Sequence, residues 1–88
     1  MDAFVHEATY TFAYDSVAIA TIIERSVRPE VGDIDDDRSR VQLSRSNSRI
    51  EITVEAADLV ALRAASNTWL SLVAVAEAVA DHSGAADT

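Results

Sequence analysis

The chain has 88 residues, of which 49% are hydrophobic, and its 15 acidic and 7 basic residues give a formal net charge of -8. A chain of this length forms one domain that buries about 60–65% of its unfolded surface, so a deep catalytic pocket is not expected. The absence of cysteine excludes disulfides, thiolate catalysis and cysteine-type zinc sites. No basic segment precedes an apolar one at the start, so we expect a cytoplasmic protein without a membrane segment.

All seven basic residues are arginines, and lysine is absent. A dense acidic, lysine-free composition resembles that of proteins from salt-loving archaea. In that setting molar salt shortens the Debye length to about 3 Å, so the net charge says little about partners.

Residues 3–12 alternate between apolar and polar positions, which predicts a half-buried strand. His6 lies on the apolar parity of this strand, together with Phe4 and Tyr10. A catalytic or metal-binding His would need a second His, a carboxylate pair or a thiol near it, and none is placed to help. We therefore interpret His6 as structural, and we expect no catalytic residue, metal or cofactor.

Residues 17–28 carry apolar side chains at helical spacing, with Asp15 or Ser16 as the N-cap and Pro29 as the stop signal. Residues 30–37 hold one Gly and four Asp. The spacing does not fit a calcium-binding loop, because the Gly precedes the acidic run and no terminal Glu follows. This segment is predicted to be a solvated loop.

Residues 38–44 and 49–55 form two alternating runs around a polar turn at residues 45–48, which predicts a β-hairpin. The apolar residues of the two runs share one parity. They are Val41, Leu43, Ile50, Ile52 and Val54.

Four of the seven arginines lie on or next to this hairpin. One interpretation is that they protect an edge strand and pair with nearby Glu residues. The other is a phosphate-contacting patch that binds nucleic acid. The candidate phosphate-contacting residues are Arg38, Arg40, Arg45 and Arg49.

Residues 57–81 predict a long helix that is apolar over most of its circumference. One apolar stripe contains Leu59, Leu62, Trp69, Val73, Ala76 and Ala80. A second stripe lies beside it and contains Ala61, Ala65, Leu72, Val75 and Val79. One sheet can cover only one of these stripes, so the second predicts a partner protein. The candidate partner-binding residues on both helices are Ile19, Ile23, Leu62, Trp69, Leu72, Val75 and Val79.

Arg63 and Asn67 lie one turn apart on the narrow polar side of the long helix. If Arg63 is buried, a carboxylate or a chain carbonyl is expected within its reach. The alternative is a solvated polar strip.

The predicted order is strand, helix, strand, strand, helix. It predicts an α+β fold with two layers, a three-stranded antiparallel sheet in the order 1-3-2, and both helices on one face. The helices are expected to pack against Phe4 and Tyr10 as well as the apolar face of the hairpin. Residues 1–82 form the single domain and residues 83–88 a flexible tail.

The run from Asp58 to Leu70 follows an Ile-Glu-Ile-Thr-Val-Glu-Ala strand and resembles the signature of the Pcc family, the small dimerising subunit of the archaeal KEOPS complex. The Arg-Pro-Glu at residues 28–30 is similar to that family's Lys-Pro-Glu. The residues that match the family motif are Asp58, Leu59, Leu62, Arg63, Ala64, Asn67 and Leu70.

This resemblance implies a non-catalytic scaffold subunit in the machinery that installs threonylcarbamoyl groups on adenosine 37 of tRNA. It implies a homodimer whose helices bundle with helices of the Kae catalytic subunit, so that one dimer bridges two catalytic subunits. It implies tRNA contact only within the complex, and the four hairpin arginines named above are then the candidate tRNA-contacting residues. The alternative is a small stand-alone RNA-binding module, although the glycine loop of a KH domain is missing.

Overall fold

The computed structural model describes residues 4–33 and 36–82. The strands and helices follow the predicted order. They are β1 (His6–Ala13), α1 (Val17–Val27), the 3-10 turn η1 (Arg28–Glu30), β2 (Ser39–Ser46), β3 (Arg49–Ala56) and α2 (Leu59–His82).

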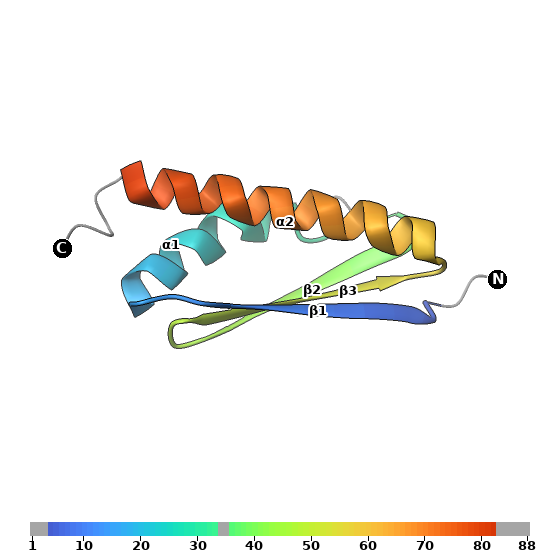
Figure 1. Ribbon diagram of the computed structural model, residues 1–88, viewed down its shortest axis with the longest axis horizontal. Helices are drawn as coiled ribbons and strands as arrows, with labels where there is room; N and C mark the ends of the chain where they lie inside the picture. The colour runs from blue at the N-terminus through green and yellow to red at the C-terminus, as the bar shows by residue number, and fades with distance from the viewer. Residues whose placement is uncertain (1–3, 34–35, 83–88) are drawn as a thin grey trace.

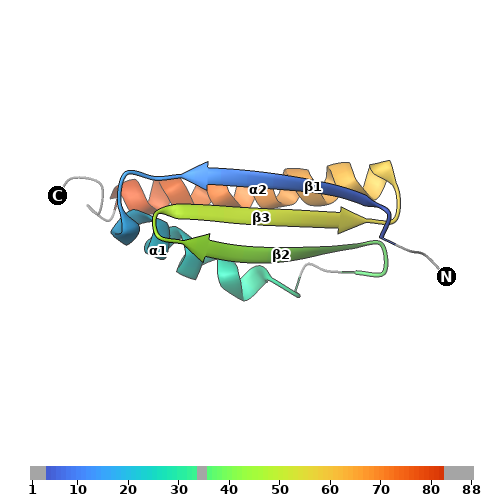
Figure 2. The ribbon, with the colours of Figure 1, turned by 90° about the horizontal axis from the view of Figure 1, so that it is seen from below.

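The three strands form one antiparallel sheet in the order β1-β3-β2, as predicted (Figure 2). Ile52 of the central strand lies opposite Tyr10 on one side and Leu43 on the other. Both helices cover the same face of the sheet (Figure 1). No helix covers the other face of the sheet. The side chains on that face are mostly Thr, Ser, Glu and Arg, which water can hydrate.

Side-chain caps fix where the two helices begin. The Ser16 hydroxyl accepts a hydrogen bond from the Ile19 amide at 3.1 Å, and an Asp58 carboxylate oxygen accepts one from the Ala61 amide at 2.8 Å. Pro29, at the end of α1, lies within a single 3-10 turn rather than in a continued helix. The predicted stop signal is confirmed.

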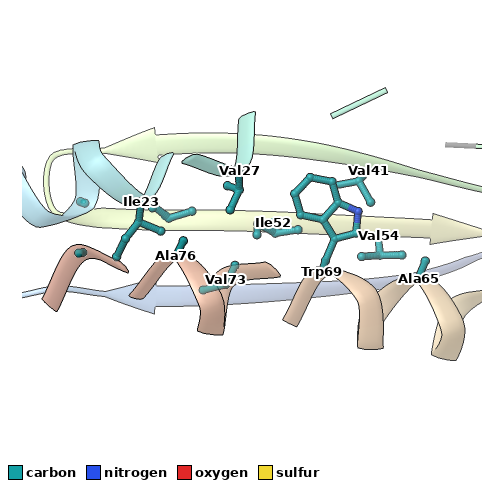
Figure 3. Close-up of a cluster of buried hydrophobic side chains, with 12 residues drawn as sticks. Ile23, Val27, Val41, Ile52, Val54, Ala65, Trp69, Val73 and Ala76 are labelled. Carbon is teal, nitrogen blue, oxygen red and sulfur yellow. The ribbon is translucent and has the colours of Figure 1, made fainter. Parts of the chain in front are cut away.

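Trp69 of α2 is the largest fully buried side chain, with 1% of its surface exposed. The rise per residue makes α2 about 36 Å long and α1 about 16 Å, so α1 covers only part of the sheet beside α2. Figure 3 shows the indole extending from α2 toward Val41 of β2, beyond Val27 at the end of α1. Trp69 therefore fills the space over the sheet that the short helix leaves open.

Three details differ from the sequence prediction. The hairpin turn has two residues rather than four, because Ser46 pairs directly with Arg49, and Asn47 adopts the left-handed φ of 58° that this tight turn requires. Leu59 lies in the first turn of α2 and is 63% exposed. Phe4 does not belong to the core. The Cζ atom of Arg40 lies over its ring, 4.8 Å from the ring centroid.

By length and composition alone, Leu59–Asp81 of α2 could cross a membrane, which the expectation of no membrane segment did not anticipate. In the structure this helix instead packs on the sheet. Its buried stripe is Ala65, Ser66, Trp69, Val73, Ala76 and Ala80. The predicted apolar stripe of the long helix is thus confirmed except at Leu59, with Leu62 half-buried at its margin.

Replacing Trp69 with Ala should lower the free energy of unfolding by about 3–5 kcal/mol, because no neighbouring element can collapse into the space left over β2. Urea denaturation followed by far-UV circular dichroism measures this loss. Val60→Ala on the same helix, where Val60 is 74% exposed, is the control and should change stability by less than about 0.5 kcal/mol. Similar stabilities for the two variants would show that Trp69 does not hold the layers together.

Candidate functional site

Two apolar sides of α1 and α2 meet beside the core and form what we call the two-helix face. Val75 and Val79 of α2 are 62% and 55% exposed. Leu72 precedes them at helical spacing and is half-buried, as are Ile19 and Ile22 on α1, and these three pack against the edge of the core. The two-helix face consists of Ile19, Ile22, Leu72, Val75 and Val79.

The orientation of α1 explains why these two sides adjoin. Glu24 lies on the opposite side of α1 from Ile22 and binds Arg45 of β2, with Nε 2.6 Å from the carboxylate oxygen. That side of α1 therefore faces β2, and the side with Ile19 and Ile22 faces α2, which α1 contacts. Ile19, at the start of α1, also borders a hollow with Tyr14 and Glu77 on the β1 side of α2. On α2, the other flank lies beside β1, because Tyr14 after β1 donates a hydrogen bond to Glu77 at 2.8 Å.

The structure divides the predicted partner-binding residues into three groups. Ile19, Leu72, Val75 and Val79 belong to the two-helix face. Ile23 and Trp69 are each only 1% exposed, so they form the core and are not available to a partner in this fold. Leu62 lies on the other flank of α2. Ile22 was missed, although its spacing from Ile19 could have identified it.

A second candidate surface is a groove between α2 and the edge strand β1, with a volume of about 290 Å³. Leucines of α2 form its walls and Tyr10 of β1 borders it. Ser66 is 6% exposed, and its hydroxyl has no hydrogen-bond partner among the residues that the structure describes. The groove is lined by Tyr10, Leu59, Leu62, Arg63, Ser66, Asn67 and Leu70.

Arg63 and Asn67 are exposed on the rim of this groove. A carboxylate or carbonyl partner was expected only if Arg63 were buried, and Arg63 is exposed. Within residues 4–33 and 36–82 it has neither an ion pair nor a hydrogen bond. The alternative of a solvated strip describes the single chain. Most motif residues line the groove, whereas Asp58 caps α2 and pairs with Arg38.

The four hairpin arginines do not form one patch. Arg38 pairs with Asp58, and the Arg40 guanidinium lies 2.9 Å from Glu55. Arg45 points to the helical layer, where it binds Glu24 and donates a hydrogen bond to the Asn47 carbonyl at 3.0 Å. Arg49, at the turn, has no ion pair within the described part of the chain. The predicted pairing of edge arginines with Glu is confirmed for Arg40.

Catalytic chemistry has little support in these residues. His6 is half-buried in β1, and the residues described contain no group of three metal-ligating side chains. Burial raises the pKa of Tyr14, as does its hydrogen bond to Glu77, so this phenol is a fixed donor rather than a base. The two-helix face and the groove beside β1 are the surfaces on which most of the candidate residues lie.

The class that this fold and these surfaces define is a small two-layer α+β protein with partly exposed apolar helix flanks. The family model described as transcription factor Pcc1 matches residues 7–81, and the chain belongs to this family. A solved structure described as the crystal structure of the binary complex Gon7-Pcc1 contains a chain with the same fold. The TM-score is 0.80 at 14% identity, over 90% of this chain and 96% of that chain. No curated protein matches the sequence.

The ion pair between Glu24 and Arg45 predicts a pH dependence of stability. Hydrogen bonds from Arg45 and Arg28 lower the pKa of Glu24 from 4.5. The carboxylate therefore stabilises the fold at neutral pH, and this stabilisation is lost as the pH falls through the lowered value. Glu24→Gln should lower the free energy of unfolding by about 1–2 kcal/mol at pH 7, with a difference that shrinks in acid.

Denaturation across a pH series measures this difference. Glu51→Gln on the open face of the sheet is the control, because Glu51 is exposed and has no arginine partner within the described residues. A constant difference between wild type and Glu24→Gln down to pH 3 would contradict the assignment.

Proposed function

We propose that this protein is a non-catalytic scaffold subunit of the KEOPS complex and supports threonylcarbamoylation of adenosine 37 in tRNA. The observation behind this proposal is the two-helix face. There the exposed side chains of Val75 and Val79 continue the apolar surface of the half-buried residues that pack against the core. Membership of the Pcc1 family supports it. The solved structure that contains a chain with the same fold is described as a binary complex, Gon7-Pcc1.

The chemistry of the two-helix face fits the apolar side of a partner helix. Its residues follow helical spacing on two adjoining helices, so one or two amphipathic helices could complete a bundle with α1 and α2. The N-terminal-lobe helices of the Kae catalytic subunit are the partner that we propose. This protein would supply no reacting group and would hold the catalytic subunit in place.

We also propose a homodimer, which would let one scaffold carry two catalytic subunits. The edge strands β1 and β2 leave backbone groups free to pair. The β2 edge is bordered by the ion-paired side chains of Arg40 and Arg45, whereas β1 adjoins the leucine-walled groove. Pairing through β1 would leave the two-helix face free, because the groove and that face lie on opposite flanks of α2.

Replacing Val75 with Asp should abolish binding of the Kae catalytic subunit while the monomer stays folded. A carboxylate buried without a partner in the interface weakens binding by about 3–5 kcal/mol. Calorimetric titration of the dimer with the purified catalytic subunit, at high salt to match the halophile-like composition, measures the affinity. The matched control is Ala78→Asp, which places the same charge on the side of α2 that points away from the sheet.

Equal weakening by both variants would show that charge, not burial at the two-helix face, controls the interaction. No binding by the wild type would overturn the scaffold proposal. The alternative function, a stand-alone RNA-binding module, would then be favoured. Tight tRNA binding by the isolated protein would identify it.

For tRNA we propose contact only within the assembled complex, since three of the four hairpin arginines are neutralised by carboxylates of the same chain. Arg49→Glu should reduce tRNA affinity and flatten its salt dependence more than Arg40→Glu, because Arg40 already binds Glu55. Filter binding of tRNA to the complex across a salt series measures both. Unchanged affinity and slope in both variants would remove the hairpin from the tRNA path.

A further inference from the structure

A hollow with a volume of about 250 Å³ lies beside the N-terminal half of α2, and we call it the alanine hollow. Ala61 and Ala65 line it, and both belong to the second apolar stripe of this helix. The same stripe continues with Leu72, Val75 and Val79 of the two-helix face, so the apolar surface of that face extends along α2 into the hollow. The other lining residues are Asp36, Arg38, Ser39, Val60, Ala64 and Thr68.

The short length of α1 explains why the hollow is present. Beside the C-terminal half of α2 the neighbouring element is α1, and Figure 3 shows Ile23 of α1 next to Ala76 of α2. α1 ends at Val27, well short of Ala65. Beside the N-terminal half of α2 there is thus no α1 to pack against, and the small alanine side chains leave the surface low.

The indole of Trp69 has an unused hydrogen-bond donor on this side of α2. Its Nε1 atom is buried and has no hydrogen-bond partner within the described part of the chain. Figure 3 shows the nitrogen on the edge of the indole that points toward Ala65 and the start of β2. Ala65 and Ser39, the first residue of β2, both line the hollow. A buried donor without an acceptor is unfavourable, so the single chain leaves this place incomplete.

The groups on the rim limit which side chain can enter the alanine hollow. Arg38 already pairs with Asp58, and an Asp36 carboxylate oxygen accepts hydrogen bonds from the Arg38 and Ser39 amides. Asp36 would repel an incoming carboxylate, and an incoming cation would bring donors where Trp69 needs an acceptor. A cavity of about 150 Å³ can hold a benzene ring, so the hollow has room for one long uncharged side chain.

We propose that the alanine hollow receives one long uncharged side chain with a terminal acceptor, a Met or a Gln, from the helix that binds the two-helix face. Its stem packs on Ala61, Ala64 and Ala65, and its tip enters beside Ser39 and accepts the hydrogen bond from Trp69 Nε1. A side chain held in this way is a knob in a hole and anchors the helix along α2.

This inference rests on the proposed scaffold function and deepens it by stating what the partner helix must carry. Val79 and Ala61 are 18 residues apart, which corresponds to about 27 Å along α2. A helix that reaches from the two-helix face into the hollow therefore needs about five turns in contact with α2, and the Met or Gln lies at the end that passes α1.

The first experiment fills the hollow from within. Ala64 is exposed on α2, so Ala64→Leu occupies the hollow without changing the core. The calorimetric titration with the catalytic subunit should show binding about tenfold weaker than wild type. Ala78→Leu adds the same bulk on the side of α2 that points away from the sheet and should leave the affinity unchanged. Equal affinities for the two variants would overturn the alanine hollow as a binding site.

The second experiment observes the indole directly. Trp69 is the only tryptophan in the chain, so the isotope-labelled protein gives a single indole N–H resonance in NMR spectra. Saturation with the unlabelled catalytic subunit should move this resonance downfield, because Nε1 gains an acceptor. The Ala64→Leu protein at saturation should keep the resonance of its free form. An unmoved resonance in the saturated wild-type complex would overturn the hydrogen bond to Trp69.

The outcomes separate this inference from the function on which it rests. A wild type that does not bind the catalytic subunit would overturn both. Binding that is lost in Val75→Asp but kept in Ala64→Leu, with an unmoved indole resonance, would leave the scaffold function in place and overturn the alanine hollow alone.

Discussion

The structure depends on the burial of one stripe of α2 against a sheet of only three strands. Trp69, Val73 and Ala76 lie over the sheet and exclude water from Ile52 and Val54 of the central strand (Figure 3). Burial of this kind stabilises a fold by about 25 cal/mol for each Å² of apolar surface removed from water. The sheet can cover no more of α2 than this stripe, so the helix keeps two flanks exposed.

The two flanks differ because of what stands next to each of them. On one side α1 packs against α2 and extends the apolar surface with Ile19 and Ile22. On the other side lies the edge strand β1, and here the groove carries polar groups as well as leucines. One helix therefore provides two unlike surfaces, and the function proposed for this protein uses both at the same time without a conflict between partners.

The charges of the protein follow the same division. Arginines near the helices and the hairpin are mostly bound to carboxylates of the chain itself, as with Arg45 and Glu24 or Arg40 and Glu55. The more exposed Arg40–Glu55 pair contributes little to stability, whereas the part-buried Arg45–Glu24 pair holds α1 to β2. Both pairs reduce the positive potential available to a nucleic acid. Shape and apolar surface, rather than charge, are what this protein can offer to a partner.

The sequence by itself determined the order of the elements and most of the buried stripe of α2, because alternation and helical spacing are local patterns that report directly on burial. The sheet order followed from that element order and the rule that the strand-helix-strand crossover is right-handed. It also indicated the N-cap at Ser16, one of two candidates, because a local side-chain bond sets it. The cap that Asp58 gives α2 was found only in the structure. Only the tertiary structure decided that Ile23 and Trp69 belong to the core and Val75 to the surface. These residues have the same apolar character, and their exposure depends on the short length of α1 and on which flank of α2 it covers. The tertiary structure also decided where the Arg45 side chain lies. Because the turn at Asn47 has only two residues, Arg45 stays in β2, and its side chain points to the helix-covered face, where it binds Glu24.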